Sequence, residues 1–295
     1  MSIPAFDVSE FFASAPVQVA LLVGGVVALV SGLVGVFTVM RGQSFAGHAL
    51  ADLGAVGGSA AFLLGISQLW GFVGAGIIAA GLMELVGLKH IQGRDVATGI
   101  VFGLGLGFTA LFLYLDTLQG QSSNATISVL FGSLFVIDPT VIPFVLVLGA
   151  IACLIVVVLY RWLLVDSLSQ DLASVRHIPV RLTGILFLVA LALAVELSAL
   201  TIGAVLSTAL LIGPAAAALR LTRRVGIAVI ISMAIGLGST WLGIVISYAS
   251  YDWYHGTASW PVSFCIVIVV FVAYLLSGIA IPLRARVTRR ASVVL

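Results

Sequence analysis

Long apolar segments alternate with short polar ones along the whole chain. Nine such segments approach the roughly 20 apolar residues that a helix needs to cross a membrane. They cover residues 17–40, 45–66, 71–88, 96–115, 139–160, 182–197, 200–219, 226–249 and 261–283. The sixth and seventh are nearly continuous, so the pattern predicts an all-α polytopic integral membrane protein, a bundle of eight or nine transmembrane helices.

A shorter apolar stretch, ISVLFGSLFVI at residues 127–137, follows the fourth segment. It is too short to span, so we expect a short re-entrant or interfacial helix, which is stable only where protein surrounds it. Gly99, Gly103 and Gly107 recur every four residues in the fourth segment. Small residues on one helix face allow close helix packing in lipid, so we expect a tight bundle.

The charged residues predict the orientation of the bundle. If nine spans alternate in direction, all 13 Lys and Arg residues fall on one side of the membrane. The charged residues in the loops and span ends of the other side are then all acids, namely Asp7, Glu10, Asp116, Asp138 and Asp252. Basic loops face the cytoplasm, so we expect the N-terminus outside and the C-terminus in the cytoplasm.

This map divides the chain into three parts. They are an extracytoplasmic N-terminal segment at 1–16, a single transmembrane domain at 17–283 and a basic cytoplasmic tail at 284–295. The composition agrees, because 62% of the residues are hydrophobic and only 8% are charged. A water-exposed protein needs several times more charge than this, so most of the surface must face the lipid bilayer. The net charge of +2 gives no reason to expect nucleic-acid binding.

Several enzyme signatures are missing from the sequence. It contains no G-x-x-x-x-G-K-[ST] phosphate loop, no G-x-S-x-G and no H-E-x-x-H. The loops between the apolar segments are too short for a catalytic domain outside the membrane. We therefore expect a protein that is not an enzyme, and any ATP hydrolysis linked to it would take place on a separate chain.

The stretch GHALAD at residues 47–52 places an imidazole and a carboxylate in an apolar segment. On a helix His48 and Asp52 are four residues apart and share one face. Imidazole with carboxylate suits zinc, manganese or ferrous iron better than calcium or magnesium. Two ligands make half a site, which a second copy of the chain across a twofold axis would complete. The alternative is a His–Asp hydrogen bond that fixes helix packing.

Glu196 is the other acid deep in an apolar segment, near the end that we place outside. An ionised acid at the centre of a bilayer costs about 2.5–3.5 kcal/mol on insertion scales, so such residues usually have a function or a partner. Glu196 either lines an ion path, which makes it a third candidate metal ligand, or meets water at the lipid headgroups.

Four stretches together resemble the permease subunits of ATP-binding-cassette importers for zinc and manganese. They are MRGQSFAGHALADLGAVGG at 40–58, GRDVATGIVFGLGLG at 93–107, ISVLFGSLFVIDP at 127–139 and LTIGAVLSTALLIGPAAAALRLTRRV at 200–225. The resemblance covers most of residues 17–283. In that family the first stretch usually has Asp first and His four residues later, whereas here His48 precedes Asp52.

The resemblance implies a homodimeric permease in the bacterial plasma membrane. Its partners would be a cytoplasmic ATP-binding subunit and an extracytoplasmic metal-binding protein. The cargo would be a divalent zinc, manganese or iron ion moved by alternating access, with no permanently bound cofactor. His48 and Asp52 would hold or gate the cation.

The resemblance also implies a helix that couples the permease to the ATPase. Pro214 would end the seventh span after Gly213, and residues 215–224 would form a short cytoplasmic helix. Arg220, Arg223 and Arg224 would contact acids on the ATPase. Asp171, in the loop at 166–179, would belong to a second contact. An ordinary basic cytoplasmic loop explains the same charges.

Two other classes of protein remain as alternatives. An ion-coupled secondary transporter would move its substrate without an ATPase. An intramembrane enzyme would need a fuller catalytic set than one His–Asp pair and one Glu.

Overall fold

The computed structural model describes residues 8–85, 91–119, 125–132, 134–168, 179–253 and 259–291. Helices account for nearly all of this part of the chain, and no strand occurs in it. The helices are α1 (Val8–Ala13), α2 (Ala15–Met40), α3 (Ser44–Leu63), α4 (Gln68–Leu85), α5 (Ile91–Gln119), α6 (Ala125–Phe131), the 3-10 turns η1 (Leu134–Val136) and η2 (Pro139–Val141), α7 (Ile142–Leu168), α9 (Val180–Ile202), α10 (Ala204–Leu221), α11 (Val225–Trp253) and α12 (Val262–Ala291).

Each of the nine predicted apolar segments forms one long helix, from α2 to α5, α7, and α9 to α12. Among the described residues, six of these are long and apolar enough to cross a membrane: α2, α7, α9, α10, α11 and α12. The other three contain fewer apolar residues in succession. Helix α3 carries His48, Asp52 and several glycines, and α4 and α5 each contain a shorter apolar stretch.

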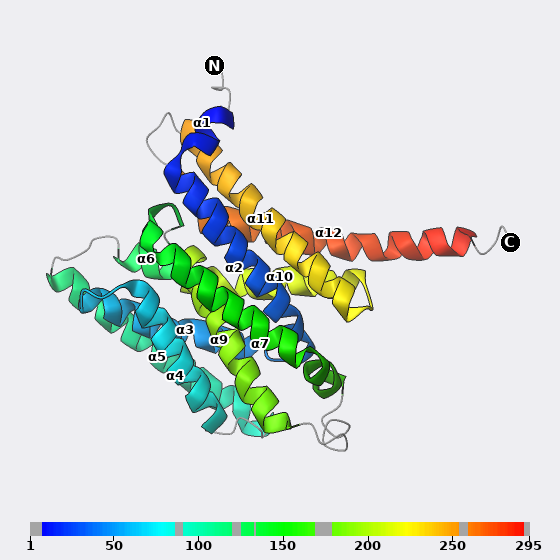
Figure 1. The fold of residues 1–295 in the computed structure, drawn as a ribbon, viewed down its shortest axis with the longest axis horizontal. Coiled ribbons are helices and arrows are strands. Elements are labelled where there is room, and N and C mark those ends of the chain that lie inside the picture. Colours follow the sequence, from blue (N-terminus) through cyan, green and yellow to red (C-terminus); the bar gives the residue numbers. More distant parts are fainter. Residues whose placement is uncertain are drawn as a thin grey trace.

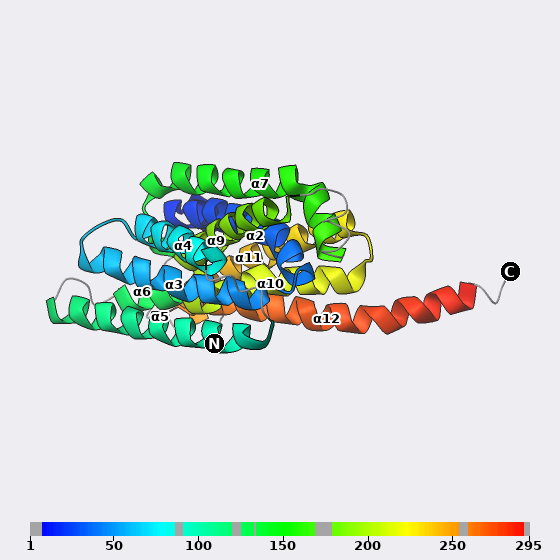
Figure 2. The same cartoon turned by 90° about the horizontal axis from the view of Figure 1, so that it is seen from below.

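Helix α9 lies at the centre of the bundle and packs against α2, α3, α4, α7 and α10 (Figure 1). Helix α3 packs against both α4 and α5 on one side of it, while α10, α11 and α12 pack against one another on the other. Figure 2 shows α7 covering one face of the bundle and the second half of α12 projecting beyond it. The central position of α9 places every side chain between Ala190 and Ala204 in the interior.

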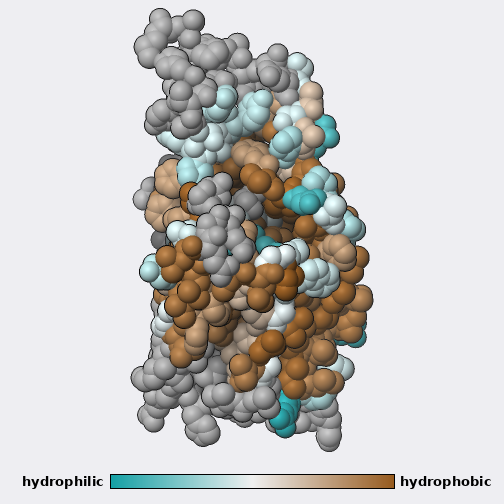
Figure 3. All heavy atoms as spheres, turned by 90° about the vertical axis from the view of Figure 1, so that its left-hand side faces the viewer, coloured by the Kyte–Doolittle hydropathy of each residue, from teal (hydrophilic) through white to brown (hydrophobic). Residues whose placement is uncertain are grey.

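The outer faces of the bundle are apolar. Exposed large side chains include Ile78, Leu118, Val158, Ile230 and Leu276, which come from five different helices. Figure 3 shows such side chains covering most of the middle of one face, with paler residues toward its two ends. A surface of this kind is stable in lipid and would aggregate in water, in agreement with the composition.

The predicted short element at 127–137 consists of α6, a bend at Gly132 and the turn η1. Gly132 has φ +79° and Gly203, which separates α9 from α10, has φ +87°. A Cβ atom on Gly132 would lie 2.3 Å from the carbonyl oxygen of Thr201, and one on Gly203 would lie 2.2 Å from that of Leu130. Only glycine fits at either position, so the end of α6 interlocks with the bend between α9 and α10.

Candidate metal site

Helix α3 begins directly after a tight turn at Arg41–Gln43. Gly42 adopts φ +65°, where glycine has no steric cost, and this reverses the chain after α2. Asp52 is eight residues beyond the first residue of α3, Ser44, so it lies about 12 Å along the helix. The turn thereby places the His48–Asp52 pair well inside the bundle.

His48 and Asp52 share one face of α3, as their spacing predicts. His48 Nε2 and Asp52 Oδ2 are 3.9 Å apart, which is too long for a hydrogen bond. Ligand atoms bound about 2.1 Å from one cation are separated by up to about 4.2 Å, so the pair could hold a metal ion between them with little movement. The Asp52 side chain is 4% exposed and its Oδ2 has no hydrogen-bond partner in the part of the chain that the structure describes, whereas the His48 side chain is 35% exposed. The pair therefore has a buried side and an open side.

Glu196 on α9 lies in the interior, 1% exposed, and neither of its carboxylate oxygens has a hydrogen-bond partner among the described residues. Its side chain occupies a space left by two glycines. A Cβ atom on Gly54 of α3 would lie 1.7 Å from Oε2, and one on Gly76 of α4 would lie 2.5 Å from Cγ. The possibility that Glu196 meets headgroup water is wrong for this fold, because three helices enclose it.

Asp52 and Glu196 lie on opposite sides of one turn of α3. Glu196 packs against Gly54, and Asp52 and Gly54 are two residues, or about 200°, apart around the helix. In the described part of the chain no three His, Cys, Asp or Glu side chains converge on one point. One chain in this conformation therefore offers a two-ligand site at His48 and Asp52, with a second buried acid on the other side of the same helical turn.

A third buried acid, Asp166 on α7, has a partner. Arg41 Nη1 donates to Asp166 Oδ2, although the two residues are 125 positions apart. Arg41 also lies over the ring of Phe187 on α9, with its Cζ 5.0 Å from the ring centroid. The ion pair connects α2, α7 and α9 next to the turn that leads into α3. The sequence alone does not predict this pair, because Arg41 is only one of the 13 basic residues on one side of the membrane.

The predicted break at Pro214 is wrong. Helix α10 continues through Pro214 to Leu221, so residues 215–224 do not form a separate helix. Proline within a membrane helix is tolerated where neighbouring helices satisfy or shield the freed carbonyl, and Pro214 is buried among them. The chain leaves the helix only at Thr222, whose backbone is extended.

The arginines proposed for coupling differ in their surroundings. Arg220, in the last turn of α10, donates a hydrogen bond to the Tyr274 hydroxyl of α12, and its Cζ is 3.9 Å from that ring centroid. Arg223 and Arg224 are exposed in the turn between α10 and α11. Asp171 lies outside the described residues.

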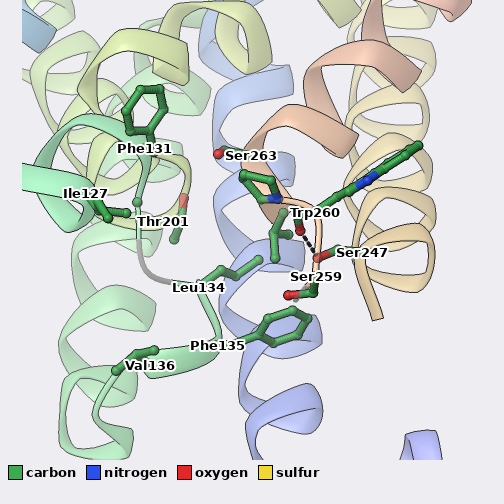
Figure 4. Close-up of a pocket in the computed structure, with 13 residues that line it drawn as sticks. Ile127, Phe131, Leu134, Phe135, Val136, Thr201, Ser247, Ser259, Trp260 and Ser263 are labelled. Carbon is green, nitrogen blue, oxygen red and sulfur yellow. Dashed lines mark hydrogen bonds between the residues drawn. The ribbon is translucent and has the colours of Figure 1, made fainter. Parts of the chain in front are cut away.

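A pocket of about 450 Å³ lies between the α6–η1 segment and the start of α12. Figure 4 shows Phe131, Leu134 and Trp260 around it, with Ser247 donating a hydrogen bond to the Trp260 carbonyl. None of the described residues that line the pocket carries a carboxylate or an imidazole. The described lining therefore lacks the ligands that a transition metal needs, and the His48–Asp52 pair remains the candidate metal site.

Comparisons with known proteins agree with this architecture. The profile of the ABC 3 transport family matches residues 14–280. The manganese transport system membrane protein MntC of Listeria innocua is 30% identical over 259 residues, covering 88% of this chain and 89% of that protein. The manganese import system permease protein ScaB of Streptococcus gordonii is 28% identical over 232 residues, covering 79% of this chain and 82% of that protein.

The fold also matches solved structures. PsaBC from Streptococcus pneumoniae, in complex with Fab, superimposes with a TM-score of 0.78 at 26% identity and covers 92% of this chain and 95% of that chain. A metal-chelate type ABC transporter in an inward-facing conformation has a TM-score of 0.73 at 16% identity, covering 95% of this chain and 91% of that chain. The second match shows the fold alone.

An all-helical bundle with a lipid-compatible surface and buried ionisable groups defines the protein as a multi-pass membrane permease. The chain belongs to the ABC 3 transport family. It is the transmembrane subunit of an ABC importer in the plasma membrane, and ATP hydrolysis takes place on a separate subunit.

Proposed function

We propose that the cargo of this importer is manganese and that His48 and Asp52 bind the ion as it crosses the membrane. The observation that carries the proposal is the unpartnered Asp52 carboxylate oxygen, 3.9 Å from His48 Nε2 in the interior of the bundle. One nitrogen and one oxygen ligand suit manganese, and they also suit zinc and iron. The relatives named for manganese import favour manganese among the three. The metal is cargo, so the permease needs no permanently bound cofactor.

The open side of the pair supports a site shared between two copies of the chain. Phe45, one turn before His48 on α3, is 48% exposed although it is large and apolar. A second permease packed on this face would cover Phe45 and contribute its own His48 and Asp52. Four ligands would then surround the ion. Glu196, behind the same turn of α3, would attract the cation and accept it as the helices change their tilt.

The orientation follows from the charges. With all nine long helices spanning, the basic residues face the cytoplasm, the N-terminus lies outside and the C-terminus inside. Arg41 follows the first span and Arg224 follows the seventh, so the two lie on one side when nine helices cross. If α9 and α10 together made a single crossing, Arg224 would lie on the opposite side. The extracytoplasmic metal-binding protein then docks on the α6 end of the bundle.

The ATPase would contact the turn between α10 and α11. Arg223 and Arg224 are exposed there and can pair with acids on another chain. Arg220 acts differently, since Tyr274 fixes its side chain and so connects α12 to the end of α10. Pro214 would serve as the point where α10 bends during transport, and Asp171 would belong to a second contact.

The test is uptake of radioactive manganese by cells that carry the permease, its ATPase and its binding protein. We expect His48→Ala and Asp52→Ala to lower uptake by ten-fold or more, because even outer partners of metal ligands contribute roughly 10–100-fold. The assembled complex should still form. Thr117→Val is the matched control, since the Thr117 hydroxyl donates to the Leu113 carbonyl of its own helix.

Two outcomes would contradict the proposal. Normal uptake by both variants would remove the role of the pair. Uptake that persists with an ATPase subunit unable to hydrolyse ATP, but stops when the proton gradient is collapsed, would indicate an ion-coupled secondary transporter instead. A panel of competing zinc, iron and manganese ions in the same assay identifies the cargo.

A further inference from the structure

The buried face of α5 carries two polar side chains in an otherwise apolar row. Gly105, Thr109, Leu113 and Asp116 are all buried, and their spacing places them within about 80° around the helix. This face packs against α3, because a Cβ atom on Gly105 would lie 3.6 Å from the carbonyl oxygen of Asp52. The row therefore begins beside the candidate metal site and runs about 16 Å along the helix to Asp116.

Asp116 has no partner in the described part of the chain. It is 0% exposed, and neither Oδ1 nor Oδ2 accepts a hydrogen bond. The hydropathy pattern predicts Asp116 at the water-exposed end of a span, where a carboxylate would be solvated. A buried carboxylate without a partner is costly in a membrane protein and usually marks an ion pathway. Solvation by water therefore does not explain a carboxylate at this position.

Several threonines on long helices bond to their own helix. Thr38, Thr117 and Thr183 each donate their hydroxyl to the carbonyl four residues earlier. The Thr109 hydroxyl is buried and, like that of Thr240 on α11, makes no hydrogen bond within the described part of the chain. It lies between Asp116 and the level of Asp52, about 6 Å from Gly105 along α5. Two unpartnered oxygen-bearing side chains thus follow one another toward the metal site.

We propose that Asp116 is the first binding site for the metal ion in the membrane domain, and that Thr109 is the next ligand on its way to Asp52. The proposal rests on the proposed cargo and orientation, in which the Asp116 end of α5 faces outward. Carboxylate and hydroxyl oxygens suit a divalent ion such as manganese that still carries part of its water shell. The α3–α5 interface would be the route between the extracytoplasmic side and the His48–Asp52 pair.

The experiment uses the complete importer in proteoliposomes, with the manganese-loaded binding protein supplied in excess and radioactive manganese as the probe. Asp116→Asn should lower the uptake rate per folded complex by about five-fold or more, and Asp116→Glu should restore most of it. Thr109→Val, which preserves shape, should lower the rate by about two- to five-fold. Thr117→Val is the matched control and should transport at the wild-type rate, because the Thr117 hydroxyl bonds within its own helix to the Leu113 carbonyl.

Comparison with Asp52→Ala and with the wild-type importer separates failure of the α5 route from failure of the proposed function. If Asp116→Asn and Thr109→Val transport at the wild-type rate while Asp52→Ala does not, the α5 route is wrong and the proposed function stands. If the wild-type importer takes up no manganese, the proposed function itself is wrong. Should Asp116→Asn fold poorly, Asp116→Leu provides the decision, because a purely structural position would accept leucine with unchanged uptake per folded complex.

Discussion

Two buried acids in this permease have opposite surroundings. Asp166 on α7 accepts a hydrogen bond from Arg41, and the ion pair is enclosed by α2, α7 and α9. Glu196 on α9 is buried to a similar degree, but its two oxygens have no partner among the described residues. Removing one partner of a buried pair is costly, and a buried acid without a partner is retained at a cost in stability. The difference supports a structural role for Asp166 and the proposed role of Glu196 as a group available to a cation.

The largest effect on stability should come from breaking the paired acid. Arg41→Met leaves Asp166 charged and buried, and removing one member of a buried pair costs about 3–5 kcal/mol. The double variant Arg41→Met/Asp166→Leu should recover most of that loss, because no charge is then left alone. Thermal unfolding of the purified complex, followed by tryptophan fluorescence, measures the stability of the single and the double variant. An unchanged unfolding midpoint in Arg41→Met would show that the ion pair does not hold these helices.

A smaller effect should follow from filling the space around the unpaired acid. In Gly76→Ala the new methyl group would lie 2.5 Å from Glu196 Cγ, so the carboxylate must move in a packed interior. Overpacking of this kind costs about 1–3 kcal/mol, and uptake per folded complex should also fall. Gly74→Ala on the same helix is the matched control, since nothing lies within 4 Å of its Cβ position. Equal uptake and stability in the two variants would contradict the placement of Glu196.

The smallest effect should come from a neutral polar contact near Glu196. The hydroxyl groups of Ser31 on α2 and Ser198 on α9 are 2.8 Å apart and buried. Ser198→Ala should cost about 1 kcal/mol and leave uptake per folded complex unchanged. The double variant Ser31→Ala/Ser198→Ala should cost less than the two single losses combined. A drop in uptake for Ser198→Ala would mean that neutral contacts on α9 also participate in transport.

The fold was largely predictable because long apolar segments leave the chain few options in lipid. Each segment became one helix, and even the bend between the sixth and seventh lies at Gly203, next to the polar stretch at Ser198–Thr201. Pro214 was misjudged, since the rule that proline ends a helix comes from water-exposed helices. In this bundle, packing around Pro214 keeps α10 continuous.

The candidate site was only half predictable. His48 and Asp52 are close in sequence, so their spacing alone placed them on one face. Glu196 depends on Gly54 and Gly76 from two other helices, and Arg41 depends on Asp166 at a distance of 125 residues. Asp116 was assigned to the aqueous boundary because hydropathy gives depth along the membrane normal but not which way a side chain points. Contacts between segments that are distant in sequence become known only from the packed structure.

The contact between Gly132 and Gly203 has a consequence for how the protein is made. The two residues are 71 positions apart, so at about 5–20 residues per second the ribosome supplies Gly203 roughly 4–14 s after Gly132. During that interval α6 has no bend to interlock with, and its seven residues are too few to span the membrane on their own. The nascent chain therefore cannot complete the packing around α6 until α9 and the start of α10 have been inserted.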